Sequence, residues 1–261
     1  MQCIWIFLIC LSASTIGGTC GIGGGVIIKP LLDSLHIMST SVISFLSSVS
    51  VLSMSTISVL RQRKNGLVDR RIGTLLAIGA ILGGIAGNAA FRALRGSSSH
   101  DALVGVVQNA TLAILTILTL LYSTWLRDKL PSYHVHHPAG CVALGILMGV
   151  MSSFLGIGGG PINLAILYFA FSMNTKQAAA NSLYIIFFSQ VASLITHLIC
   201  RTIPDFSWPL LAIMVAASIC GGLLGSQINR TLSTPRINRL FSVLLGLITG
   251  ICLYNMHRFL N

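Results

Sequence analysis

The stretch LSASTIGGTCGIGGGVIIKPLL at residues 11–32 interrupts a long apolar run with GIGGG at 21–25. The same five letters return at 156–160, inside SSFLGIGGGPINLAIL at 152–167. Each glycine costs a helix about 1 kcal/mol relative to alanine, so three in succession are a strong local break. Both stretches therefore predict a helix that stops and starts again within an apolar segment.

The composition around these breaks is that of a membrane protein. Of 261 residues, 54% are hydrophobic and 8% are charged, and the mean hydropathy is +0.87. Soluble domains carry about 25% charged residues, and a bilayer core of about 30 Å needs about 20 apolar residues per helix. We expect an all-α polytopic protein with eight hydrophobic segments, at 3–32, 39–60, 72–94, 102–126, 139–171, 178–200, 208–229 and 238–256.

Positive charge is concentrated in the short loops. Sixteen Lys and Arg against five acidic residues give a net charge of +11, and RQRKNGLVDRR at 61–71 is the densest cluster. Cytoplasmic loops of membrane proteins are enriched in Lys and Arg, which explains this cluster without nucleic-acid binding. We predict a multi-pass protein of the cytoplasmic membrane with loop 61–71 on the cytoplasmic side.

The chain repeats itself. A shift of 135 residues superposes the two GIGGG motifs, Ser47 on Ser182, and LLAI at 75–78 on LLAI at 210–213. The prediction is one membrane domain made of two four-segment repeats, at 1–126 and 139–261, joined by a polar linker at 127–138.

The first segment of each repeat, which holds the motif, is expected to be broken or re-entrant. Re-entry would place eleven basic residues on the side of loop 61–71 and five on the other, whereas eight full crossings divide them nine to seven. Charge asymmetry across the membrane favours the first arrangement, in which the two repeats are inverted. Full crossing by segments one and five stays open.

Glycines can also serve simply to bring helices close together. Gly17, Gly21 and Gly25 have the GxxxG spacing of such contacts, and we interpret Gly79, Gly83 and Gly87, like Gly246 and Gly250, as packing residues. Packing needs one small residue per turn, not three in a row. Glycine-interrupted segments at corresponding places in two halves instead indicate a transporter's binding site.

The chain resembles the TauE/SafE family of sulfite and organosulfonate permeases over nearly its whole length. The resemblance is carried by GIGGGVIIKPLL at 21–32, LGIGGGPINLAIL at 155–167 and AAANSLYIIFFSQ at 178–190. It implies passage of small sulfur-containing or carboxylate anions across the cytoplasmic membrane. One difference between the halves is that Lys29 and Pro30 align with Leu164 and Ala165, so the halves need not contribute alike.

A helix that restarts inside the membrane offers free backbone N–H groups to an anion. The predicted substrate-binding residues are therefore those of the two breaks, namely Gly21, Gly23, Gly24, Gly25, Gly156, Gly158, Gly159, Gly160 and Pro161. Lys29 either adds a positive charge to this pocket, or it snorkels to the interface or caps a helix end. Asn163 is a candidate donor, Asn181 and Gln190 are predicted to line the path, and Ser47 and Ser182 belong to hydroxyl stripes with a path-lining or a helix-bonding role.

The remaining expectations concern what the chain lacks. The five aspartates, at 33, 69, 101, 128 and 205, fall at predicted span ends or in loops, which leaves no obvious carboxylate inside the membrane for Na⁺ or proton coupling. We expect no cofactor, no metal site and no enzymatic activity, and export of an anion along the membrane potential. A divalent or soft metal-ion permease is the alternative, prompted by eight Met, seven Cys and seven His, and an intramembrane enzyme is a weaker one. The expected partners are a small anion and the lipid bilayer, with a homo-oligomer left open.

Overall fold

The computed structural model describes residues 2–35, 37–62, 66–97, 101–126, 133–135 and 137–260, and within these ranges it contains helices and no strand. The N-terminal half holds α1 (Gln2–Cys20), α2 (Gly25–Leu35), α3 (Thr40–Gln62), α4 (Arg70–Ser97) and α5 (Asp101–Leu121), which ends in the short π-helix η2 (Tyr122–Leu126). The C-terminal half holds α6 (Pro138–Leu155), α7 (Pro161–Phe171), α8 (Thr175–Ile199), α9 (Trp208–Thr231) and α10 (Thr234–Leu260).

Eight of the described helices are long and apolar enough to cross a membrane: α1, α3, α4, α5 with η2, α6, α8, α9 and α10. Large apolar side chains such as Leu118, Leu198 and Leu247 are exposed on the outside of the bundle, whereas Ser47 and Asn163 are fully buried. Large apolar side chains that cover the outside, with polar side chains buried within an apolar core, are expected where lipid is the solvent. The all-α, multi-pass class is confirmed.

The helices stop at the glycine motifs for local reasons that are visible in the backbone. Gly156 caps α6 in the left-handed conformation, with φ 63°, and its N–H bonds the carbonyl of Ser153 at 3.2 Å. Gly160 has φ 61°, and Pro161 then opens α7 at a position where its missing N–H costs nothing. The predicted segments 3–32 and 139–171 are thus each two helices, and the first pair reaches Leu35.

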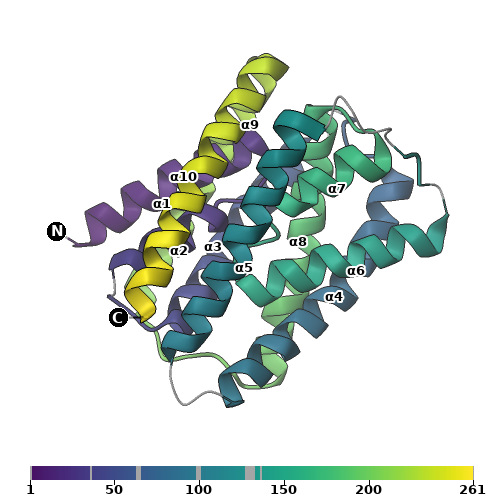
Figure 1. Ribbon diagram of the computed structural model, residues 1–261. Coiled ribbons are helices and arrows are strands. Elements are labelled where there is room, and N and C mark those ends of the chain that lie inside the picture. The colour runs from purple at the N-terminus through teal and green to yellow at the C-terminus, as the bar shows by residue number, and fades with distance from the viewer. Residues whose placement is uncertain are drawn as a thin grey trace.

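The pair α6 and α7 forms a hairpin. The N–H groups of Tyr133 and Val135, just before α6, bond the carbonyls of Phe169 and Ala170 at 2.8 and 2.9 Å, at the end of α7. The start of α6 and the end of α7 therefore lie on the same side of the bundle, and Gly156–Gly160 forms the tip of the hairpin between them (Figure 1).

Helices that correspond in the two halves pack against each other in opposite directions. Phe45, near the start of α3, lies edge-on to His197, near the end of α8, with ring centroids 5.6 Å apart. Helices α5 and α10 lie side by side (Figure 1), and Thr116 bonds Thr249 at 2.9 Å, while Asn109 and Asn255, nearer the start of α5 and the end of α10, are 3.4 Å apart. Both contacts make corresponding helices antiparallel.

The two hairpins pack on helices of the opposite half, and here the directions are parallel. Ser14 bonds Ser218 at 3.2 Å, and Thr19, further along α1, bonds the carbonyl of Gly225, further along α9, at 3.3 Å. In the same way, Gly79 and Gly87 of α4 approach Gly145 and Val150 of α6. The first helix of each half thus packs against a helix of the other half, α1 on α9 and α6 on α4.

These directions place the helix ends on two sides of the bundle. We call the side where α3 and α9 end the basic side, because the described residues Arg61, Lys176, Arg230, Arg236 and Arg239 lie at helix ends there. Helix α1 runs toward this side, whereas α3 starts again at the opposite side, so α2 must return between them. The linker residues 127–132 and His136 lie outside the described residues.

The packing role expected for Gly79, Gly83 and Gly87 is correct, because a Cβ at each would run into the backbone of α6. The same interpretation is wrong for Gly246 and Gly250. A Cβ at either position would meet no atom within 4 Å, so these glycines of α10 face outward.

Candidate functional site

The two glycine motifs meet at the centre of the bundle. A Cβ on Gly23 would lie 3.6 Å from the carbonyl oxygen of Gly158, and one on Gly160 would lie 2.9 Å from the side chain of Val26. A Cβ on Gly25 would approach the Ile157 carbonyl. Only residues without a side chain let the two hairpin tips come this close.

Helices α3 and α8 pack against the two tips in equivalent ways. Gly156 packs on Ser44 and Gly21 on Ala179, and these pairs are equivalent under the shift of 135 residues. Gly158 packs on Val51, and Gly23 packs on Ile186, again at equivalent positions. The two halves thus meet each other through the same contacts.

The backbone N–H groups at both hairpin tips have no acceptor among the described residues. Among the described residues, no carbonyl accepts a hydrogen bond from the N–H groups of Gly23, Gly24, Gly25 or Val26, and the first bonds of α2 start at Ile27 and Ile28. The second motif repeats this pattern, since the N–H groups of Gly158, Gly159 and Gly160 also lack partners among the described residues. The first hydrogen bond of α7 runs from the N–H of Asn163 to the carbonyl of Gly160. Buried N–H groups without acceptors are rare in folded proteins, and helix N-termini attract anions.

Three predicted polar residues are buried without hydrogen-bond partners near this junction. Asn163 lies against Gly159, is fully buried, and neither atom of its amide has a partner. The hydroxyl groups of Ser47 and Ser182 are equally buried and unpartnered, at equivalent positions of α3 and α8. Because leaving a buried polar group unpaired costs about 1–3 kcal/mol, these side chains indicate a place for water or a polar ligand.

The other two predicted path-lining residues have partners for their amide nitrogens, whereas Gln190 Oε1 and Asn181 Oδ1 are buried without partners. The Gln190 amide donates to the Ser152 hydroxyl at 3.0 Å and ties α8 to α6. The Asn181 amide donates to the carbonyls of Gln177 and Leu67 at 2.8 and 3.3 Å. Asn181 lines a separate cleft of about 300 Å³ whose wall includes Gly66, Asp69 and Ser172, so it lies toward the basic side and away from the tips.

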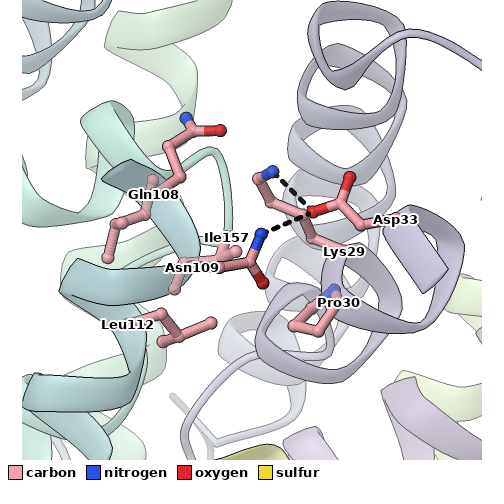
Figure 2. A pocket seen from close by; sticks show the side chains of 8 residues that line it. Lys29, Pro30, Asp33, Gln108, Asn109, Leu112 and Ile157 are labelled. Atoms are coloured by element: carbon pink, nitrogen blue, oxygen red, sulfur yellow. Dashed lines mark hydrogen bonds and ion pairs between the residues drawn. The ribbon is translucent and has the colours of Figure 1, made fainter. Parts of the chain in front are cut away.

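Lys29 is buried and ion-paired, so the snorkelling interpretation is wrong. Its Nζ donates to the Asp33 carboxylate at 3.1 Å, one turn further along α2, and the two side chains are 3% and 1% exposed. Figure 2 shows the Asn109 amide of α5 pointing at the same carboxylate oxygen, at 3.5 Å. The expectation that no carboxylate lies within the bundle is also wrong, because α2 continues past the predicted end of its segment and carries Asp33 inside.

The space beside this pair is small and lined by acceptors. A cavity of about 10 Å³ lies between Lys29, Asp33, Gln108, Asn109 and the second motif's Ile157. Asp33 Oδ1, Gln108 Oε1 and the nearby Asn255 Oδ1 are buried without partners. A volume of about 10–15 Å³ holds one water molecule, which could donate to such oxygens. In this conformation the pair is neutral as a whole and presents no free positive charge.

Sequence reasoning missed Asp33, Gln108, Asn109 and Asn255. The signal was available in part, because polar residues inside apolar segments are uncommon and Gln108 and Asn109 stand together in one. Their pairing with α2 is a contact between segments far apart in the chain. The Asn255 amide, for example, bonds the carbonyl of Pro30 at 2.8 Å.

The described residues contain no group of three or more His, Cys, Asp or Glu side chains placed to hold a metal ion. The chemistry that the junction offers is hydrogen-bond donation from backbone and amide groups. Such a site suits a small ligand that carries acceptor oxygens.

Comparison with known proteins points to one family. The family model described as sulfite exporter TauE/SafE matches residues 6–252. The chain is 26% identical over 271 residues to the probable membrane transporter protein YunE of Bacillus subtilis, covering 95% of this chain and 96% of YunE. No solved structure matches.

Shorter matches agree with this result. Over 190 residues the chain is 24% identical to the probable membrane transporter protein MamO of Magnetospirillum gryphiswaldense, covering 70% of this chain and 30% of MamO. Over 113 residues it is 30% identical to the probable membrane transporter protein MJ0441 of Methanocaldococcus jannaschii, covering 41% and 42% of the two chains. With a family model that spans both glycine motifs and eight helices able to cross a membrane, this chain is a membrane transporter that belongs to the sulfite exporter TauE/SafE family.

Proposed function

We propose that this transporter moves small anions out of the cell across the cytoplasmic membrane, with sulfite, organosulfonates or related sulfur-containing and carboxylate anions as substrates, and that it is not an enzyme. The observation that carries the proposal is the set of unpartnered N–H groups at the meeting point of the two hairpin tips. Asn163, Ser182 and Ser47 would supply further donors there, because each is buried with a free polar group. Backbone dipoles hold an oxyanion without a fixed positive charge that would trap it.

Lys29 can contact the anion only under one condition. Its ammonium is compensated by Asp33, so it can attract an anion only when that pair opens. Because the pair as a whole is neutral, a transported anion carries its own charge through the protein. An inside-negative potential then drives a monovalent anion outward with about 2.3 kcal/mol per 100 mV.

The helix directions support a proposal for the arrangement in the membrane. We propose that the two halves are inverted repeats, each with a re-entrant hairpin, because α3 with α8 and α5 with α10 are antiparallel pairs. A two-fold axis that reverses corresponding helices must lie in the plane of the membrane. The positive-inside rule then assigns the basic side to the cytoplasm.

Native cysteines test this orientation. Cys200 is exposed at the end of α8, opposite the basic side, and Ser233 is exposed between α9 and α10 on the basic side. We expect a membrane-impermeant maleimide to label Cys200 in intact cells and to label a Ser233→Cys variant at its new position only after permeabilisation. Labelling of both positions from outside would contradict the inverted arrangement.

Transport by purified protein in liposomes tests the function. We expect entrapped sulfite or methanesulfonate to leave the vesicles, and the flux to rise as a potassium diffusion potential makes the interior more negative, without Na⁺ or a pH difference. Methanesulfonate separates this result from proton coupling, since it stays an anion where bisulfite would carry its own proton. Transport of divalent metal ions with no anion flux would overturn the proposal in favour of a metal permease.

A further inference from the structure

A second polar feature lies away from the hairpin tips, at the basic side. A cleft of about 830 Å³ opens between the ends of α3 and α9. Its lining residues come from the last turn of α3 and the last two turns of α9: Leu60, Arg61, Gln62, Ser226, Gln227, Arg230 and Thr231. Because both helices end here, the cleft lies at the level where the bundle meets water.

The charge in this cleft is positive, and the part of the chain that the structure describes supplies no counter-ion. Arg61 donates one hydrogen bond, from Nη1 to the Leu223 carbonyl at 3.2 Å, and Lys176 approaches the Arg230 carbonyl at 3.3 Å. Among the described residues, no carboxylate lies within ion-pair distance of either guanidinium group. The remaining N–H groups of the guanidinium groups are free to bind an anion, and a guanidinium fits two oxygens of a sulfonate or phosphate at once.

Gln62 is an independent sign of a ligand in the cleft. Its side chain is 5% exposed, yet neither the oxygen nor the nitrogen of its amide has a hydrogen-bond partner. A buried amide without partners is costly, so it indicates a place where water or a ligand completes the bonding.

The same face of α3 leads from Gln62 to the hairpin tips. Steps of three and four residues keep Ser58, Ser55, Val51, Ser47 and Ser44 on this face, and Val51 and Ser44 contact the second glycine motif. The hydroxyl groups of Ser58, Ser47 and Ser44 are buried without partners. The Ser55 hydroxyl bonds the Leu52 carbonyl at 3.0 Å, so the free hydroxyl groups lie at the two ends of this face, near the cleft and near the junction.

The equivalent face of α8 has hydrogen-bond partners toward its far end. Gln190 bonds Ser152, Asn88 donates to the Ser193 carbonyl at 3.2 Å, and His197, which corresponds to Gln62, bonds Thr202 at 3.0 Å. The rings of Phe45 and His197 pack edge to face. The two faces therefore differ at their far ends. Ser58 and Gln62 are without partners toward the basic side, whereas Ser193 and His197 are bonded toward the other side. Nearer the junction, the Ser182 hydroxyl and Gln190 Oε1 of α8 are also without partners.

We propose that Arg61, Gln62 and Arg230 form a loading site that captures a small oxyanion, such as a sulfonate, before it reaches the hairpin tips. The inference rests on the proposed function for its place in transport. The site itself is defined by charge, burial and volume in the cleft, so its binding can be measured without any transport.

Calorimetric titration of methanesulfonate onto the protein in phosphatidylcholine nanodiscs at low salt tests the site directly. We expect binding to weaken about tenfold in Arg61→Gln and in Arg230→Gln, because each removes a charge-assisted hydrogen-bond donor. Gln62→Leu is expected to weaken binding without changing the charge. The control is Arg236→Gln, which removes an exposed charge on the same side outside the cleft and should change affinity less than about twofold.

The outcomes separate this site from its alternatives. Equal weakening by Arg230→Gln and Arg236→Gln, with no effect of Gln62→Leu, would mean diffuse attraction by the basic side and would overturn the site. If added phosphatidylglycerol displaces methanesulfonate in an Arg61- and Arg230-dependent way, the cleft holds a lipid headgroup and the proposal also falls.

Transport gives a second, independent result. If wild-type protein transports methanesulfonate but the cleft variants leave half-saturation from the basic side unchanged, the function stands and the loading site is wrong. If binding depends on the cleft but no anion crosses the membrane, the loading site stands and the proposed function is wrong.

Discussion

Alanine in place of Gly159 is expected to lower anion flux by about tenfold to a hundredfold while the protein still inserts and folds. Gly159 has φ +100°, a conformation that costs an L-residue about 1–3 kcal/mol, and the new methyl group would collide with the Asn163 amide. Both effects turn the N–H groups of the second hairpin tip and displace a candidate donor. Losing one strong hydrogen bond to an anion accounts for an effect of that size.

The matched control is Gly250→Ala. This glycine also lies in a membrane helix, but a Cβ there would meet no atom within 4 Å, and alanine favours helix. Counterflow of labelled methanesulfonate in liposomes and thermal unfolding in detergent should be measured for both variants. Wild-type flux in Gly159→Ala would mean that the motif serves packing alone, whereas failure of Gly250→Ala would mean that the assay reports general helix sensitivity.

Much of the fold could be predicted because lipid imposes strong local rules. Apolar segments long enough to cross a bilayer can be recognised in the sequence, and three consecutive glycines break a helix. The breaks between α1 and α2 and between α6 and α7 could therefore be predicted. The packing of Gly83 against α6 was also predictable, since small residues at four-residue spacing usually mark close helix contacts. The same rule failed at Gly250, because spacing alone does not say which face of a helix has a neighbour.

The polar interior could not be predicted in the same way. Asp33 stands near the end of an apolar stretch, where a carboxylate normally faces water, and only the pairing of α2 with α5 and α10 buries it. Ser47 and Ser182 could likewise be selected from the sequence as candidates, but whether their hydroxyl groups bond the helix backbone could not be predicted. Ser53 and Thr56 do bond the backbone, whereas Ser47 does not, and this difference depends on three-dimensional neighbours.

Replacing Lys29 by glutamine is expected to destabilise the protein by about 3–5 kcal/mol, because Asp33 would be left as an unpaired buried charge. Asp33→Asn should lower the stability by a comparable amount, because it leaves the Lys29 ammonium as an unpaired buried charge. The double variant Lys29→Gln/Asp33→Asn removes both charges and should recover most of the lost stability, since neutral amides of similar size can bond each other, Asn109 and Asn255. Lys176→Gln, at an exposed lysine on the basic side, is the control and should leave the unfolding temperature in detergent nearly unchanged.

The double variant also decides whether Lys29 contacts the substrate, because it separates folding from function. If the ion pair opens so that Lys29 can meet the anion, the double variant should be stable and yet transport with half-saturation raised about tenfold, the effect of losing a charge-assisted bond. If the pair only holds α2 against α5 and α10, the same variant should transport like wild type, and Lys29 would no longer be counted among the substrate-binding residues. Should the double variant be as unstable as either single one, the two charges would not be compensating each other, which would contradict the 3.1 Å ion pair on which both expectations rest.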